Sequence, residues 1–250
     1  MKNKNSPYGK CPLCDKNAVL KESHIISKFI YKPVKEKTGK MTEIDNSPFL
    51  NGKTRQDGIK EYLLCGICEE RRQKYEDYVS KLIRKNTLIK NGDIYHVTGI
   101  DYVKFKLFLL FNLFMFAASK SPEFEEINIP SYYDDLKDMI LNNDPGTYAE
   151  FGCIISVLED DLPVQHKIFQ DLNDYKRIVV FPRLNRQGSE ITIVTLFGGI
   201  KWHYLLTHSP LSNEITANFL KENGELIIQK SSIIKNLKNL GLIDVIVNKK

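Results

Sequence analysis

The spacing of hydrophobic residues predicts a long amphipathic helix over residues 65–85. Apolar side chains recur there at positions i, i+3, i+4, i+7 and i+8, which places them on one side of a helix. Glu69, Arg72 and Glu76 fall on a different, polar side of the same helix. The helix is therefore expected to pack against a core through Tyr75, Tyr78, Val79, Leu82 and Ile83.

A second segment, residues 102–119, is apolar on nearly all sides and is predicted to form the central helix of a larger core. Its most apolar part, 107–118, is too short to span a bilayer, so no membrane partner is expected. Pro122 and Pro130 interrupt the chain after this helix. A further short helix is predicted over 132–142, before the turn sequence Asn-Asp-Pro-Gly.

From residue 152 onward the pattern changes to short apolar runs separated by turn residues, which favours strands. Asn-Arg-Gln-Gly at 185–188 and Gly198-Gly199 are typical of hairpin turns. The elements expected here are strands over 153–158, 177–181, 190–196 and 201–206, a helix over 231–240 and a last strand over 243–247.

The charge is unevenly distributed over the 250 residues. Residues 1–90 contain 20 Lys and Arg against 11 Asp and Glu, and residues 91–250 contain 16 against 20. A basic surface attracts polyanions such as nucleic acid, although a solvated lysine-rich surface would give the same count. The apolar content of 42% and the charged content of 27% exclude wholesale disorder.

Four of the five cysteines form two Cys-x-x-Cys pairs, Cys11 with Cys14 and Cys65 with Cys68. The first ten residues are polar and lack the apolar run of a signal peptide, so we expect a cytoplasmic protein with reduced thiols. Paired thiols in a reducing compartment predict a structural Zn²⁺ site. Cys153, alone in an apolar stretch, is interpreted as a buried small hydrophobic residue.

These patterns together predict an α+β fold. Residues 1–10 are expected to be a flexible tail, and 11–90 a zinc-bound module. Residues 91–150 are expected to form a helical segment, and 151–250 an α+β C-terminal domain, mostly antiparallel sheet, that packs with those helices. Within the module, the polar, turn-rich stretch 31–60 is held at both ends by the cysteine pairs, which is typical of a functional loop.

His24 is the candidate general base, because imidazole titrates near neutral pH and can take a proton from water. Asp57 and Glu69 are the candidate ligands of a catalytic Mg²⁺ or Mn²⁺, since both ions prefer oxygen. The alternatives are that Glu69 only complements the helix dipole and that Asp57 with Gly58 only forms a turn. The candidate phosphate contacts are Lys53, Arg55, Arg71 and Arg72.

Three short motifs together resemble the zinc-knuckle branch of the HNH endonucleases. They are Cys-Pro-Leu-Cys at 11–14, Ser-His-Ile-Ile at 23–26 and Leu-Leu-Cys-Gly-Ile-Cys-Glu at 63–69. The family pattern is a Cys-x-x-Cys pair, then Asp-His or His-His before two apolar residues, then Leu-Cys-x-x-Cys followed by Asn or His. The resemblance covers residues 11–85.

The resemblance implies a treble-clef-like ββα-metal module that cuts nucleic acid with the help of one divalent ion. Carried over by position, His24 is the general base, and the four paired cysteines hold the structural zinc. Ser23 stands where the family usually has a metal-binding Asp or His, and Glu69 stands close to its last Asn or His. Gln56 and Asp57 lie in the region of its middle Asn.

The favoured hypothesis is a metal-dependent endonuclease acting on nucleic acid, with DNA preferred. The alternative is a zinc-stapled module that binds nucleic acid or acts as an adaptor without catalysis. A third interpretation is an effector of stress or phage defence in which the C-terminal domain gates the nuclease. The C-terminal domain is then the expected surface for a partner protein or a second copy of the chain.

Overall fold

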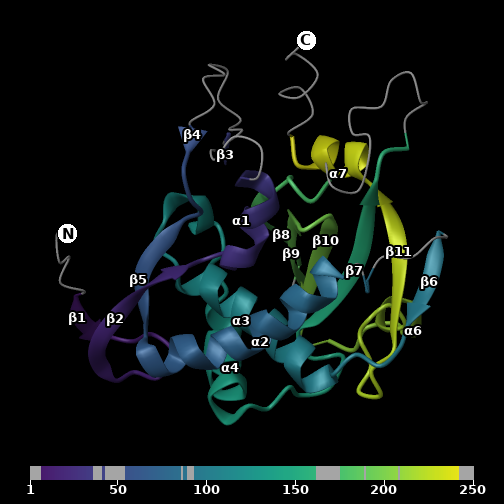
Figure 1. Ribbon diagram of the computed structural model, residues 1–250. Helices are drawn as coiled ribbons and strands as arrows, with labels where there is room; N and C mark the ends of the chain where they lie inside the picture. The colour runs from purple at the N-terminus through teal and green to yellow at the C-terminus, as the bar shows by residue number, and fades with distance from the viewer. Residues whose placement is uncertain are drawn as a thin grey trace.

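The computed structural model of the protein describes residues 7–35, 41–42, 54–85, 87–88, 93–161, 175–188, 190–207 and 209–241. Within these ranges the chain combines helices with three separate sheets, the mixed α and β content that the sequence predicts (Figure 1). The strand expected over 243–247 lies outside the described residues.

The N-terminal part is built on a three-stranded antiparallel sheet in the order β1-β2-β5. Its strands are β1 (Tyr8–Lys10), β2 (Asn17–His24) and β5 (Lys60–Cys65). Residues 8–10 therefore belong to this sheet, although the sequence placed them in the tail. Between β2 and β5 lie helix α1 (Lys28–Lys35) and a short ladder of β3 (Met41–Thr42) with β4 (Thr54–Arg55).

Helix α2 (Gly66–Arg84) confirms the predicted amphipathic helix. Tyr75, Val79 and Ile83 are buried, as their spacing indicates. The polar side differs from expectation, because Arg72 and Glu76 are buried as well. They are buried because the end of β2 and the start of α1 cover that side of the helix, where both side chains find partners.

Helix α3 (Tyr102–Ala118) is the predicted central helix, and nearly all of it is buried. Asp101 caps its N-terminus by accepting a hydrogen bond from Lys104 N at 3.0 Å. Phe105 and Phe108 of α3 pack against Trp202, at centroid distances of 6.1 and 5.9 Å. Among the described residues, no helix combines the length and the apolar character that crossing a membrane requires.

A short 3-10 turn, η1 (Pro122–Phe124), leads from α3 into helix α4 (Pro130–Asn142). Asn143 then adopts a left-handed conformation with φ of 53° and ends α4, as is typical of a helix C-terminus. This agrees with the short helix and the following turn that the sequence predicts.

A six-stranded sheet in the order β6-β11-β7-β10-β9-β8 forms the C-terminal part. Neighbouring strands are antiparallel except β11 and β7, which are parallel. Gly198 and Gly199 connect β9 to β10 with φ of 66° and 79°, a backbone that glycine adopts most easily. The strands are β6 (Ile94–Val97), β7 (Gly152–Glu159), β8 (Val180–Gln187), β9 (Glu190–Phe197), β10 (Ile200–Leu206) and β11 (Leu226–Ser232).

Two strands of this sheet were not predicted from the sequence, β6 and β11. β6 has only four residues, and the second half of β11 is polar. They pair with each other across more than a hundred residues of chain, so their stability comes from partners far away in the sequence. The predicted strand over 177–181 is displaced toward the C-terminus as β8, whereas the predicted C-terminal helix is present as α7 (Ile233–Asn239).

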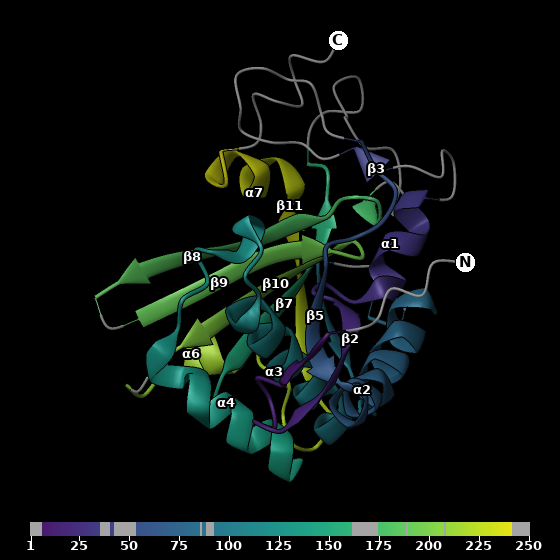
Figure 2. The ribbon, with the colours of Figure 1, turned by 90° about the vertical axis from the view of Figure 1, so that its left-hand side faces the viewer.

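The helices and the two larger sheets share one hydrophobic core. A single cluster of buried side chains runs from Cys11 in the N-terminal part to Ile228 on β11. α3 packs against the six-stranded sheet and is flanked by α2 and α4, and Figure 2 shows α1 and α2 on the opposite side of the molecule from β8 and β9. A smaller cluster, which includes Leu196 and Leu237, packs α7 against the other face of the sheet.

Candidate metal centre and histidine site

The fold brings the two cysteine pairs together at one end of the small sheet. Cys11 and Cys14 lie in the turn between β1 and β2, where Asp15 adopts a φ of 59°. Cys65 ends β5 and Cys68 lies in the first turn of α2. Because β2 pairs with β5, with Leu20 opposite Cys65, the sheet register sets the separation of the two pairs.

The four thiols have the geometry of a metal site. Their sulfur atoms all lie within 4.8 Å of one another, and the sulfurs of Cys14 and Cys65 are 3.8 Å apart. Tetrahedral zinc with Zn–S bonds of about 2.3 Å separates its sulfurs by about 3.8 Å. The backbone N–H of Cys65 also donates to the Cys11 sulfur at 3.4 Å. The structure therefore confirms a four-cysteine cluster that fits a structural zinc ion.

The contact between the thiols of Cys11 and Cys68 moves their pKa values in opposite directions. The pKa of Cys11 is lowered to about 4, mainly because the Cys68 thiol donates a hydrogen bond to it. The pKa of Cys68 is raised for the converse reason, and burial raises it further. A bound zinc ion would take the place of the thiol protons, because zinc binds cysteine as the thiolate.

His24 ends β2, and the same strand pairing brings it close to Asp57. His24 lies opposite Lys60 in the sheet, and Asp57 lies in the turn just before β5. The distance from His24 Nε2 to Asp57 Oδ1 is 3.3 Å, and the imidazole is 12% exposed. Asp57 also contacts Lys35 through Oδ1 and Lys60 through Oδ2, both at 2.6 Å.

The position after Asp57 needs a glycine. A Cβ atom on Gly58 would lie 2.1 Å from the ring of Tyr31. The Gly58 N–H donates to Asp57 Oδ1 at 3.0 Å, which holds the carboxylate in place. The Asp-Gly turn that the sequence shows is thus present, and it also positions the carboxylate beside His24.

The burial of His24 favours the neutral imidazole. Burial lowers the pKa of His24, and the Asp57 carboxylate opposes this shift without cancelling it. Burial by itself raises the pKa of Asp57, but the ammonium groups of Lys35 and Lys60, together with the nearby imidazole of His24, hold it well below its usual range. A neutral imidazole beside an ionised carboxylate is the state that a general base requires.

Glu69 contacts Ser23 in this structure. The Ser23 hydroxyl donates to Glu69 Oε2 at 2.7 Å, and Ser23 is fully buried. Neighbouring residues of a strand point to opposite faces, so Ser23 and His24 direct their side chains away from each other. Of all the described residues, only the four cysteines gather three or more side chains of metal-binding type. His24, Asp57 and Glu69 do not gather into one such group: Asp57, one expected ligand of Mg²⁺ or Mn²⁺, lies beside His24, whereas Glu69, the other, is bonded to Ser23.

Two of the three arginines expected at a phosphate surface, Arg71 and Arg72, bond to the protein itself. Arg71 donates to the carbonyls of Ile140 and Leu141 at 2.9 and 2.6 Å, which ties α2 to the end of α4. The Arg72 side chain is 2% exposed and pairs with Glu76 at 2.7 Å. Lys53 lies outside the described residues, and of Arg55 only the backbone is described.

Arg72 has a supporting position that the sequence did not reveal. Its Nη1 donates to the carbonyl of His24 at 2.6 Å and its Nη2 to that of Ile25 at 3.2 Å. Glu76, its ion-pair partner, accepts a hydrogen bond from Ser27 at 2.7 Å. This buried network fixes the backbone that carries the imidazole.

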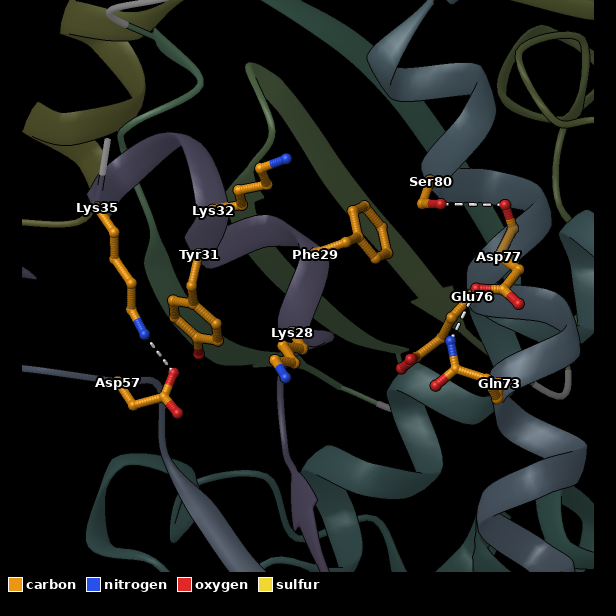
Figure 3. A pocket seen from close by; sticks show the side chains of 10 residues that line it. All are labelled: Lys28, Phe29, Tyr31, Lys32, Lys35, Asp57, Gln73, Glu76, Asp77 and Ser80. Carbon is orange, nitrogen blue, oxygen red and sulfur yellow. Dashed lines mark hydrogen bonds and ion pairs between the residues drawn. The ribbon is translucent and has the colours of Figure 1, made fainter. Parts of the chain in front are cut away.

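A cavity of about 530 Å³ lies between α1 and α2, next to Asp57 (Figure 3). Lysines at 28, 32 and 35 have helical spacing, which indicates one basic side of a helix, but the sequence predicts a loop for most of this segment. The lining residues are Lys28, Phe29, Tyr31, Lys32, Lys35, Asp57, Gln73, Glu76, Asp77 and Ser80.

Cys153 is buried, as the sequence predicts, and His203 is half-buried. Cys153 is 3% exposed in β7, and burial raises the pKa of its thiol. Burial in β10 lowers the pKa of His203 to about 4, which fits a packing role.

Comparison of the chain with protein-family models, with curated proteins and with solved structures gave no match.

Proposed function

We propose that this chain is an endonuclease that hydrolyses phosphodiester bonds in nucleic acid, with His24 as the general base. The observation that supports this most is the His24–Asp57 contact at 3.3 Å, beside the two lysines that Asp57 holds. The resemblance to the zinc-knuckle endonucleases points to the same residue, and favours DNA as the substrate.

Phosphodiester hydrolysis needs a base for the attacking water and positive charge near the phosphate oxygens. Because Nε2 of His24 faces Asp57, Nδ1 is the nitrogen left to take the proton from water. Asp57 orients the ring and stabilises the imidazolium that forms. Lys35 and Lys60 hold their ammonium groups at this carboxylate, where they place positive charge beside the reacting phosphate.

The zinc cluster supports this arrangement without taking part in it. It ties the β1–β2 turn to the start of α2, and so fixes the strand that ends in His24. We assign no step to a second divalent ion, because the side chains expected to bind it contact other groups.

The proposal is tested by cleavage of a labelled single-stranded oligonucleotide and by plasmid nicking, each measured with Mg²⁺, with Mn²⁺ and with EDTA. We expect His24→Ala to lower the cleavage rate by about 10²–10⁴-fold, the range typical for loss of a general base. His96→Ala, on the exposed edge strand β6, is the matched control, and both variants should keep the zinc content of the wild type. Equal cutting by the wild type and His24→Ala would refute the proposal.

A second candidate is a nucleic-acid-binding module without catalysis. The hydrogen bond from Ser23 to Glu69 favours it, since this carboxylate is then not directed toward His24. This function predicts salt-sensitive binding that His24→Ala leaves intact, together with no cleavage by the wild type under any metal condition. Cleavage that disappears in His24→Ala would decide against it.

A further inference from the structure

The two walls of the cavity between α1 and α2 differ in chemistry (Figure 3). Its volume of about 530 Å³ lies within the range of roughly 300–1,000 Å³ typical of small-ligand sites. The α1 wall carries Lys28, Lys32 and Lys35, which share one side of the helix. The α2 wall carries the amide of Gln73 and the carboxylate of Asp77.

Two of the three lysines are available to a ligand. Lys35 is held by Asp57 at 2.6 Å. Lys28 and Lys32 are exposed and form no ion pair with another described residue. Two ammonium groups one helical turn apart, beside a cavity, favour an anion such as a phosphate.

The α2 wall offers hydrogen-bond acceptors in place of cationic groups. Gln73 Nε2 donates to Asp77 Oδ1 at 2.8 Å, and no described cation pairs with Asp77. An amide oxygen and a carboxylate oxygen accept hydrogen bonds from ring N–H and amino groups, the groups that nucleic-acid bases carry on their edges. Glu76 is already bonded to Arg72 and Ser27, so it serves as a fixed part of the lining.

We propose that this cavity binds one unstacked nucleotide of the substrate. Its phosphate contacts Lys28 and Lys32, and the edge of its base contacts Gln73 and Asp77. A base inside a duplex enters a pocket only after leaving its stack, which costs free energy that a single strand does not pay, so the favoured substrate class is single-stranded nucleic acid. This inference rests on the proposed function, because Asp57 both lines the cavity and contacts His24.

The test measures binding by fluorescence anisotropy in the His24→Ala background, which prevents cleavage. A short labelled oligonucleotide is used single-stranded and annealed to its complement. We expect the single strand to bind at least tenfold more tightly than the duplex. The double variant Lys28→Gln, Lys32→Gln should weaken single-strand binding about tenfold, and lower the slope of log K against log salt by about 0.7 for the one phosphate.

Matched variants separate this pocket from general charge effects. Lys235→Gln with Lys238→Gln removes the same charge from exposed lysines of α7, and should leave single-strand affinity unchanged. Gln73→Ala should change the ranking of homo-oligonucleotides of different base. Equal affinity for single strand and duplex, or the same loss in the α1 and α7 double variants, would overturn the proposal.

The outcomes also separate this inference from the proposed function. If the wild type cleaves nucleic acid and the pocket variants keep their KM for both single strand and duplex, the nucleotide site is wrong and the nuclease stands. The wild type could instead cleave nothing, while Lys28→Gln with Lys32→Gln weakens single-strand binding and Lys235→Gln with Lys238→Gln does not. The nucleotide site then stands and the nuclease is wrong.

Discussion

At the scale of single residues, the site depends on how Asp57 shares its two carboxylate oxygens. Oδ1 contacts His24 and Lys35, and Oδ2 contacts Lys60. Asp57 stays ionised because these contacts outweigh the effect of burial on its pKa. The same carboxylate partly restores the pKa that His24 loses by burial. A change at Asp57 should therefore be visible in the titration of His24.

Asp57→Asn is expected to lower the pKa of His24 further below its ordinary value of 6.5, because the carboxylate that raises it is gone. Since the base must be neutral to accept a proton, the acid limb of the pH–rate profile should move to lower pH, with a lower plateau. Histidine NMR titration and kcat/KM against pH measure both effects. Glu190→Gln, at the exposed start of β9, is the control, and a higher His24 pKa in Asp57→Asn would contradict this interpretation.

A second residue-scale prediction concerns the buried amine of Lys106. It donates to the backbone carbonyls of Glu150 and Phe151, and burial lowers its pKa from 10.5 to about 8. Between these values the unfolded chain binds more protons than the folded one. The contribution of Lys106 to the free energy of unfolding therefore rises as the pH rises from about 8 to 10.5.

Lys106→Met removes this contribution. From pH 7.5 to 10.5, the free energy of unfolding of the wild type should rise by about 3 kcal/mol relative to that of Lys106→Met. One pKa unit corresponds to about 1.4 kcal/mol. Urea denaturation at several pH values measures the difference. The exposed Lys74→Met should show no such gain, and a constant gap between wild type and Lys106→Met would refute the assignment.

At the scale of elements, the zinc cluster is the connection that holds the small sheet to α2. β1 has three residues and β2 is half-exposed along much of its length, so these strands bury little apolar surface of their own. The metal is therefore expected to supply stability that packing does not.

Removing the metal should loosen the N-terminal part before the rest. With a chelator, or in Cys65→Ser, hydrogen exchange should accelerate in β1, β2 and the first turn of α2, while β7, β9 and β10 stay protected. Elemental analysis should find one zinc per chain in the wild type and in Cys153→Ala, and less in Cys65→Ser. Unchanged exchange in β2 after zinc loss would show that the cluster does not support this sheet.

At the scale of the whole molecule, the histidine site is attached to a core that continues into the six-stranded sheet. Arg71 bonds to the end of α4, and the neighbouring Arg72 bonds to the carbonyl of His24. α2 therefore links the site to the helices that cover the sheet. Because α2 also packs against α3, the packing of the C-terminal part and the position of His24 depend on the same helix.

The sequence by itself determined the features that depend on local spacing. The apolar repeat defined α2, the run of large apolar residues defined α3, and the paired cysteines defined the metal cluster. The two helix signals lie within one continuous segment each. The two Cys-x-x-Cys motifs are far apart, but paired thiols of this spacing have few functions besides metal binding. The β9–β10 turn belongs here as well, because adjacent glycines favour the left-handed backbone it needs.

Only the tertiary structure decided which side chains meet across long stretches of chain. The pairing of β2 with β5 sets Asp57 beside His24. The alternation of side chains along β2 turns Ser23 away from His24, and Glu69 of α2 bonds to Ser23. Arg72 is buried where α2 covers the end of β2, and its guanidinium donates to the carbonyl of His24 there. Such contacts arise from strand register and helix packing, which are set by the burial of the whole core rather than by neighbouring residues.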